Sequence, residues 1–191
     1  MRIIDTFLKV LIEEQIIEEK DYDLYYYCAD IIFSGMLFYS FIFAIAFVTG
    51  QVDITIAYYV GFFAIRYTGG GYHASSSKKC FALSVSVYFV SMVLIYIISK
   101  TMCREVMIGV LLGWEFIVWK FAPVDHSNKK FSAQEYIYYK QKSRVFSVVI
   151  SVLVFIIWKK NFLLACAINV GALVAALSIF VVHTRKEGNR C

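Results

Sequence analysis

The stretch "FLLACAINVGALVAALSIFVV" at residues 162–182 contains no charged side chain. A transmembrane helix needs about 20 apolar residues to cross roughly 30 Å of hydrocarbon, and this stretch is long enough. The rest of the 191-residue chain has the same character, since 60% of it is hydrophobic, 17% is charged and Pro123 is the single proline. A soluble domain is about 25% charged and about 45–50% apolar. The sequence therefore predicts an integral membrane protein.

Further apolar segments complete the predicted architecture. We expect spans at about 31–49, 54–65, 81–99, 106–122, 145–158 and 162–182. The fold class is then all-α, a polytopic integral membrane protein with about six transmembrane helices in a single membrane domain, 1–191. The second and fifth segments are short, and residues 54–65 could instead form a half-crossing or re-entrant segment.

Lys and Arg residues are distributed unevenly over the segments that connect the predicted spans. With six crossings, 15 of the 19 lie on the side that holds both termini and the loops at 66–80 and 120–144. Cytoplasmic loops of membrane proteins carry the excess of Lys and Arg. We therefore expect both termini and the 66–80 loop on the cytoplasmic side. The same topology explains the net charge of +5 without a nucleic-acid partner.

Residues 1–22 form a separate segment before the first predicted span. Apolar residues recur there at a spacing of three to four, which predicts an amphipathic helix at the membrane interface or against the bundle. Acidic residues scattered through the segment, together with the lack of a small-residue cleavage site, are unlike a cleaved signal peptide. We expect this segment to stay on the mature protein.

Two further features concern packing. Gly109 and Gly113, in "GVLLG", form a small-xxx-small face that lets two helices approach closely. Packing within the chain is the simpler interpretation, and a homodimer seam is the alternative. The cysteines show no paired spacing, so no disulfide framework is expected; they are Cys28, Cys80, Cys103, Cys166 and Cys191.

The polar stretch "RYTGGGYHASSSKKC" at residues 66–80 separates two apolar segments and ends on a candidate nucleophile. If Ser77 caps the third span, Lys78 and Lys79 take the first two helical positions and Cys80 the third. Neighbouring cations and the unpaired N–H groups of a first helical turn favour a cysteine thiolate. The same N–H groups can hold the oxyanion of an acyl transfer.

His73 is the histidine nearest to this cysteine in sequence, and it is the candidate general base. In a continuous helix their separation would place His73 and Cys80 about 10 Å apart, so the chain must bend between them or just before His73. The glycines at 69–71 supply the backbone freedom for a bend. A polar loop without chemistry is the alternative at this point. No metal site is expected, because zinc needs three or four ligands and His126 is the single plausible addition.

Three acidic residues, Asp30, Asp53 and Glu115, fall at or inside apolar segments, where a charge is costly. We interpret each as an interfacial or structural residue that pairs with a cation such as Arg66. A proton relay in a transporter is the other interpretation, but such a relay needs several ionisable groups on facing helices.

The stretch at 66–80 is followed, after two more spans, by "APVDHSNKK" at residues 122–130. Together they resemble the accessory gene regulator B family of quorum-sensing membrane endopeptidases, and the resemblance covers nearly the whole chain. It implies that Cys80 and His73 are the catalytic pair and that Arg66 and Gly71 matter to the site. The expected set of substrate-binding or structural support is completed by Gly70, Ser77, Lys78 and Lys79.

The resemblance further implies cleavage of a short amphipathic precursor peptide with an acidic C-terminal tail, at the cytoplasmic face of the bacterial cell membrane. The N-terminal part of the peptide would remain on the cysteine as a thioester and then cyclise to a thiolactone or lactone. No cofactor is implied, and a homodimer is suggested. We expect Arg66 to bind the acidic tail or else to neutralise Asp53 or Glu115.

One departure from the family pattern concerns the second motif, where a proline usually follows the Asn-Lys pair and this chain has Lys130. The role of the loop at 123–130 is therefore open.

The competing function is a membrane transporter or peptide exporter without proteolytic activity.

Overall fold

The computed structural model describes residues 2–72, 76–101, 104–124 and 131–188. These residues form helices and contain no strand, so the all-α prediction is confirmed. The helices are α1 (Arg2–Glu13), α2 (Tyr22–Val48), α3 (Val52–Gly69), α4 (Ser77–Thr101), α5 (Arg104–Phe121), α6 (Ala133–Trp158) and α7 (Phe162–Gly188), with a 3-10 turn at Glu19–Asp21.

Each predicted apolar segment coincides with one of the helices α2 to α7. Within the described residues, four helices are long and apolar enough to cross a membrane, namely α2, α4, α6 and α7. The other two, α3 and α5, have 18 residues each. The charged residues of α3, Asp53 and Arg66, lie near its ends, and α5 carries Arg104, Glu105, Glu115 and Lys120. The chain is thus a multi-pass membrane protein, and the count of six spans stays a prediction.

The fifth predicted segment is longer than its apolar residues suggested. Helix α6 has 26 residues. It begins at a capping box, in which Ser132 and Glu135 each accept a hydrogen bond from the other's backbone N–H, at 3.2 and 2.9 Å. Because this box starts the helix in polar sequence, the helix extends well before the apolar part. The expectation of a short segment at 145–158 was wrong.

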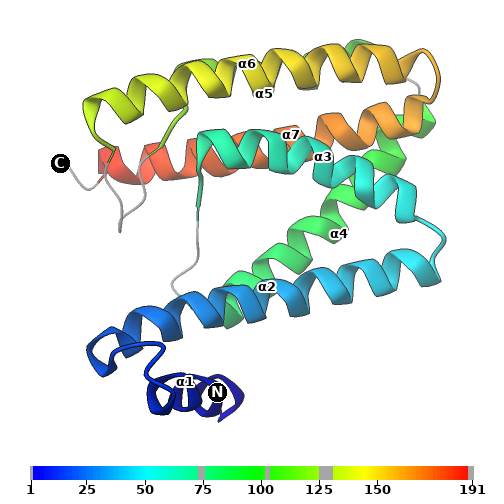
Figure 1. Cartoon of the computed structure of the whole chain (residues 1–191). Helices are drawn as coiled ribbons and strands as arrows, with labels where there is room; N and C mark the ends of the chain where they lie inside the picture. Colours follow the sequence, from blue (N-terminus) through cyan, green and yellow to red (C-terminus); the bar gives the residue numbers. More distant parts are fainter. Residues whose placement is uncertain (1, 73–75, 102–103, 125–130, 189–191) are drawn as a thin grey trace.

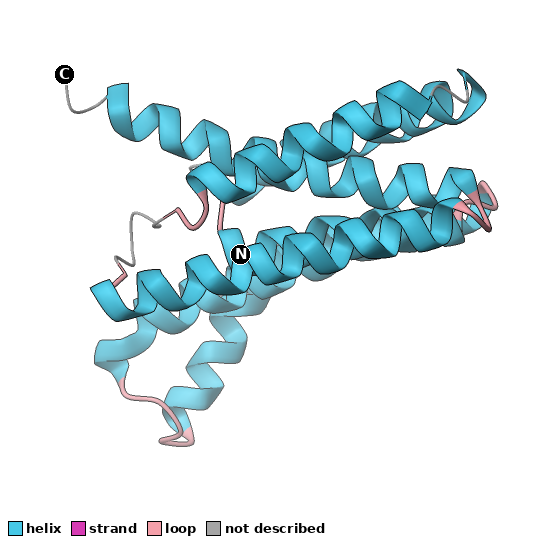
Figure 2. Cartoon of the chain, turned by 90° about the horizontal axis from the view of Figure 1, so that it is seen from above, coloured by secondary structure: helices cyan, strands magenta, loops and turns pink. Residues whose placement is uncertain are grey.

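Helix α7 lies at the centre of the bundle. It runs beside α3, with α5 and α6 along its other side, while α4 crosses diagonally from α7 to α2 (Figure 1). Figure 2 shows the same helices from above. The buried face of α7 is made largely of small residues, Ala165, Ala167, Gly171, Ala172, Ala175 and Ala176. Small residues let neighbouring helices come close inside a membrane.

The closest approach joins α3 to α7. A Cβ atom on Gly61 would collide with the backbone oxygen of Ile168, and one on Gly171 would collide with the backbone oxygen of Tyr58. The two backbones can pack at this distance only because neither glycine has a side chain. This contact holds α3 firmly against α7, and α3 carries Arg66 in its last turn.

Gly109 and Gly113 do not take part in such a contact. Among the described residues, a Cβ atom on either glycine would meet nothing within 4 Å apart from its chain neighbours and the backbone of its own helix. The expectation that they pack within the chain was therefore wrong. The pair Gly61 and Gly171, which was not singled out from the sequence, makes the close helix contact instead.

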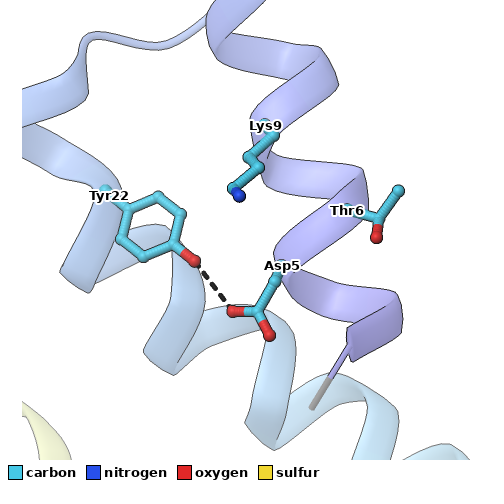
Figure 3. Close-up of a pocket in the computed structure, with 4 residues that line it drawn as sticks. All are labelled: Asp5, Thr6, Lys9 and Tyr22. Atoms are coloured by element: carbon cyan, nitrogen blue, oxygen red, sulfur yellow. Dashed lines mark hydrogen bonds between the residues drawn. The ribbon is translucent and has the colours of Figure 1, made fainter.

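The N-terminal segment is shorter as a helix than expected. Helix α1 ends at Glu13, and Gln15 then adopts a left-handed φ of 57°, so a single helix over residues 1–22 was wrong. Ile4, Leu8 and Ile17 are buried against the start of α2. The Tyr22 hydroxyl donates to Asp5 Oδ1 at 2.9 Å, beside a shallow pocket that Thr6 and Lys9 also line (Figure 3). These contacts place α1 against α2.

Candidate active site

The first turn of α4 carries Cys80. Its backbone N–H donates to the Ser76 carbonyl at 2.9 Å, and the Lys79 N–H reaches the Ser76 hydroxyl at 3.4 Å. The cap is therefore Ser76, and the predicted cap at Ser77 was wrong by one residue. Cys80 still lies within the first turn, with a free and half-buried thiol. The amides of Ser77 and Lys78 precede the first intrahelical bond, as in any helix.

Helix α2 holds this end of α4 in place. The Ser77 hydroxyl donates to Asp30 on α2. Phe81, next to Cys80, packs against Phe38 and Phe41 of α2 with ring centroids 5.9 and 6.0 Å apart. A carboxylate beside a helix N-terminus is favoured by the helix dipole. Asp30 therefore pairs with the start of α4, and not with Arg66, the cation that was named as an example of a partner for the three acids.

Two glycines shape the chain where it leaves α3. Gly70 has φ 74° and Gly71 has φ 141°, backbone conformations that L-residues rarely adopt. A Cβ atom on Gly71 would also collide with the Arg66 guanidinium and the Ser178 hydroxyl. Any side chain at Gly71 would push Arg66 out of its place, so both glycines support the structure of the site.

Arg66 holds this glycine segment from the side of α3. Its Nη2 donates to the Tyr72 carbonyl at 2.6 Å, and its Nη1 donates to the Gly70 carbonyl at 3.4 Å. Nη1 also donates to the Ser178 hydroxyl of α7 at 2.8 Å. The guanidinium therefore ties α7 to the backbone that leads toward His73.

Arg66 does not pair with the acidic residues expected from the sequence. Asp53 accepts a hydrogen bond from the Ile54 N–H at 2.8 Å, at the start of α3. Glu115 accepts one from the Ser151 hydroxyl at 2.5 Å, between α5 and α6. The expectation that either acid neutralises Arg66 was wrong.

The Arg66 guanidinium is largely removed from solvent, just beyond the predicted span at 54–65. Burial lowers the pKa of Arg66, while negative charge on Cys80 and on Tyr39 of α2 acts in the opposite direction. Tyr39 reaches this region because its ring packs against Phe63, one turn before Arg66, with centroids 5.7 Å apart.

The second sequence motif lies against the first. The Val124 N–H donates to the Gly69 carbonyl at 3.0 Å. The Val124 carbonyl packs so closely over Gly70 that a Cβ atom there would lie 2.8 Å from its oxygen. The described part of the loop at 123–130, namely Pro123 and Val124, thus supports the glycine segment.

Sequence reasoning missed several residues that shape this site. The Arg185 guanidinium of α7 lies 4.6 Å from the centroid of the Tyr72 ring, a cation–π contact. Ser178 and Tyr39 also come from other elements. Each is far from residues 66–80 in sequence and has no motif of its own, so only its place in the fold reveals it.

Some predicted residues lie outside the part of the chain that the structure describes. They include His73, Cys103, His126 and the remainder of the second motif at 125–130. The pairing of His73 with Cys80 therefore stays a prediction. Lys78 and Lys79 are described and are exposed beside Cys80.

Comparison with known proteins assigns the chain to a family. The family model described as Accessory gene regulator B matches residues 4–181. No curated protein and no solved structure matches the chain. The match includes both motifs, the glycine segment with Arg66 and the half-buried Cys80. The chain therefore belongs to the accessory gene regulator B family, which gives it a role in the quorum-sensing system of that name.

Proposed function

We propose that this protein is a membrane-embedded cysteine endopeptidase that processes a signal-peptide precursor. One observation supports this most directly. Cys80 lies half-buried in the first turn of α4, and Arg66 fixes the backbone of Tyr72, the residue before His73. A nucleophile at a helix N-terminus and a fixed backbone before its candidate base are features that a cysteine endopeptidase needs.

In the proposed reaction the thiol of Cys80 attacks the carbonyl carbon at the cut while His73 accepts the thiol proton. The new C–S bond gives a tetrahedral oxyanion, which the free first-turn amides of Ser77 and Lys78 can hold. As the oxyanion collapses, the C–N bond breaks and His73 returns the proton to the leaving amine. The C-terminal part of the precursor leaves, and the N-terminal part remains as a thioester on Cys80.

The second half of the reaction closes a ring. A cysteine or serine side chain within the bound peptide attacks the thioester carbonyl, with His73 accepting its proton. The C–S bond to Cys80 then breaks and the thiol is restored. A thiolate is a good leaving group, and the covalent intermediate divides one difficult step into two. The product is a thiolactone or lactone signal peptide.

The proposed substrate is a short amphipathic peptide with an acidic C-terminal tail. The exposed Lys78 and Lys79 lie beside Cys80, where they can attract that tail.

The uneven distribution of Lys and Arg supports a bacterial cell membrane topology with both termini and the active-site loop on the cytoplasmic side. Six crossings fit this distribution, and a homodimer is the proposed assembly.

The direct test mixes the full chain, reconstituted in lipid, with the precursor encoded beside it. Mass spectrometry follows the released C-terminal fragment and the mass of the acyl-enzyme. The wild type and a Cys28→Ala control, which removes an exposed cysteine on α2, should release the fragment. Cys80→Ala and His73→Ala should release none, and neither should form an adduct. Release by Cys80→Ala at the wild-type rate would show that the cysteine endopeptidase proposal is wrong.

A further inference from the structure

The segment that leaves α3 lies along one face of the last turns of α7. A Cβ atom on Gly71 would collide with the Ser178 hydroxyl. The ring centroid of the next residue, Tyr72, lies 4.6 Å from the Arg185 guanidinium. Ser178 and Arg185 are seven residues apart, so they lie on the same side of the helix. Gly71 and Tyr72 therefore both rest on this face of α7.

Tyr72 is held at two different points. Its carbonyl accepts a hydrogen bond from Arg66 Nη2 at 2.6 Å, which fixes the main chain from the side of α3. Its ring lies within cation–π distance of Arg185, which fixes the side chain from the side of α7. One contact alone would let the residue turn about that point. Two contacts from different helices restrict both the position and the orientation of Tyr72.

Arg185 is well suited to hold a ring at this place. Its side chain is exposed and Tyr72 is half-buried, so the contact lies at the surface of the protein. A guanidinium is planar and more weakly hydrated than an ammonium, so it stacks on an aromatic face at a lower cost. At an exposed site such a contact favours the held position by a factor of about two to five in the equilibrium constant.

We propose that Arg185 is a positioning residue for the active site. It holds the Tyr72 ring against α7, while Arg66 holds the Tyr72 carbonyl. Because a peptide bond joins Tyr72 to His73, a fixed Tyr72 restricts the positions that the candidate base can take. The consequence for peptide cleavage rests on the function proposed above, whereas the effect on the backbone of residues 70–72 does not.

Substitutions on both sides of the contact test this role. Arg185→Ala removes the guanidinium, and Arg185→Lys keeps the charge without the planar group. Tyr72→Leu removes the aromatic face, and Tyr72→Phe keeps it. Lys100→Ala is the matched control, because Lys100 is also an exposed cation over a tyrosine ring, that of Tyr96 in its own helix, at 5.5 Å.

Two readouts are measured on the full chain in lipid. The first is the hydrogen-exchange rate of the amides of residues 70–72, corrected for the intrinsic rate of each sequence and followed by mass spectrometry. This rate reports how often the segment leaves its place and needs no substrate. Exchange of residues 104–121 in the same molecules reports any general loss of stability. The second readout is kcat and KM for release of the C-terminal fragment from the precursor peptide.

Arg185→Ala should speed exchange of residues 70–72 by about twofold to fivefold, because the held position loses that factor in its equilibrium constant. The same variant should lower kcat more than it raises KM, because the precursor still binds while the candidate base is misplaced more often. Arg185→Lys should fall between Arg185→Ala and the wild type. Tyr72→Phe should stay within about twofold of the wild type in both readouts, since its ring remains.

The double variant decides whether the two residues act through each other. Arg185→Ala combined with Tyr72→Leu should change exchange and kcat no more than either single substitution does, because both remove the same contact. Effects that multiply in the double variant would show that Arg185 does not act through Tyr72, and the proposal would be wrong.

Two further outcomes would overturn the proposal. One is exchange of residues 70–72 in Arg185→Ala equal to that in Lys100→Ala, which would show that Arg185 serves only as a surface charge. The other is an equal increase at residues 104–121, which would show only a general loss of stability. If peptide release persists in Cys80→Ala, the endopeptidase proposal fails, while the exchange series still decides the role of Arg185.

Discussion

Helices α7 and α2 have the same length, 27 residues, and both are apolar enough to cross a membrane, yet they differ in surroundings. In the apolar 18-residue stretch of each helix, the rest of the chain buries 61% of the residues of α7 but 11% of those of α2. The buried helix is rich in alanine, whereas α2 exposes large side chains such as Phe41, Phe43 and Phe47. Residue size therefore separates the two helices where hydropathy does not. Inside a membrane, lipid is as apolar as a leucine side chain, so close packing of small residues decides which helices associate.

The largest expected effect on stability comes from replacing a glycine by leucine, which we compare between the two helices. Gly171→Leu places a side chain against the backbone of Tyr58 and should prevent α3 from docking on α7, at a cost above about 3 kcal/mol in the free energy of unfolding. Gly35→Leu in α2 enters open space and should be tolerated. Size-exclusion chromatography and thermal unfolding in detergent measure the difference. Equal behaviour of the two variants would contradict the comparison.

A smaller effect is expected from the polar bridge between α5 and α7. Trp114 Nε1 donates to Asn169 Oδ1 at 2.7 Å, and Asn169 Nδ2 donates to the Met107 carbonyl at 2.9 Å. Asn169→Leu leaves the buried Trp114 N–H without a hydrogen bond and removes a second hydrogen bond from the Met107 carbonyl, so it should lower the free energy of unfolding by about 1–3 kcal/mol. Ser40→Leu on the exposed side of α2 is the control and should have little effect. A loss of equal size in both variants, measured by denaturant titration, would argue against a special role for this bridge.

The smallest effect concerns α1, which is attached to the exposed helix. The hydrogen bond from Tyr22 lowers the pKa of Asp5 below its ordinary value of 3.8. The attachment is therefore at full strength above the ordinary pKa and weakens as pH falls through the lowered value. Hydrogen exchange of residues 2–13, corrected for the intrinsic rate at each pH, should speed up below about pH 4. In Tyr22→Phe, exchange should already be faster at neutral pH, and an unchanged acid response in that variant would rule out this hydrogen bond as the cause.

The same contrast explains which parts of the fold the sequence predicted. Long apolar segments fix where helices form, because each backbone polar group in lipid must be satisfied within its own helix. Helix boundaries were harder to predict from the sequence, as the start of α6 at the capping box of Ser132 shows. Helix contacts were the hardest to predict, because the same small-xxx-small pattern occurs where the glycines face open space, at 109 and 113, and where they touch backbone, at 57–61 and 171–175.

The candidate site also contains some residues that the sequence identified and some contacts that it did not. The cluster at 66–80 identified Cys80, Arg66 and the glycines, because their residue types are unusual in so apolar a chain. The partners of Arg66 were predicted incorrectly, since opposite charges suggest pairs while the fold instead brings a neutral serine into contact. The link between Val124 and Gly69 could not be predicted either, because backbone hydrogen bonds between distant segments leave no trace in residue type.

The sequence by itself determined an all-helical membrane protein with a cysteine-containing polar segment between two apolar helices, because hydrophobicity and residue chemistry are properties of the chain. Only the tertiary structure decided that α7 lies at the centre and that Ser178 meets Arg66. Those facts depend on which helix faces fit closely enough to exclude lipid, and that fit is a property of shapes brought together from distant parts of the chain.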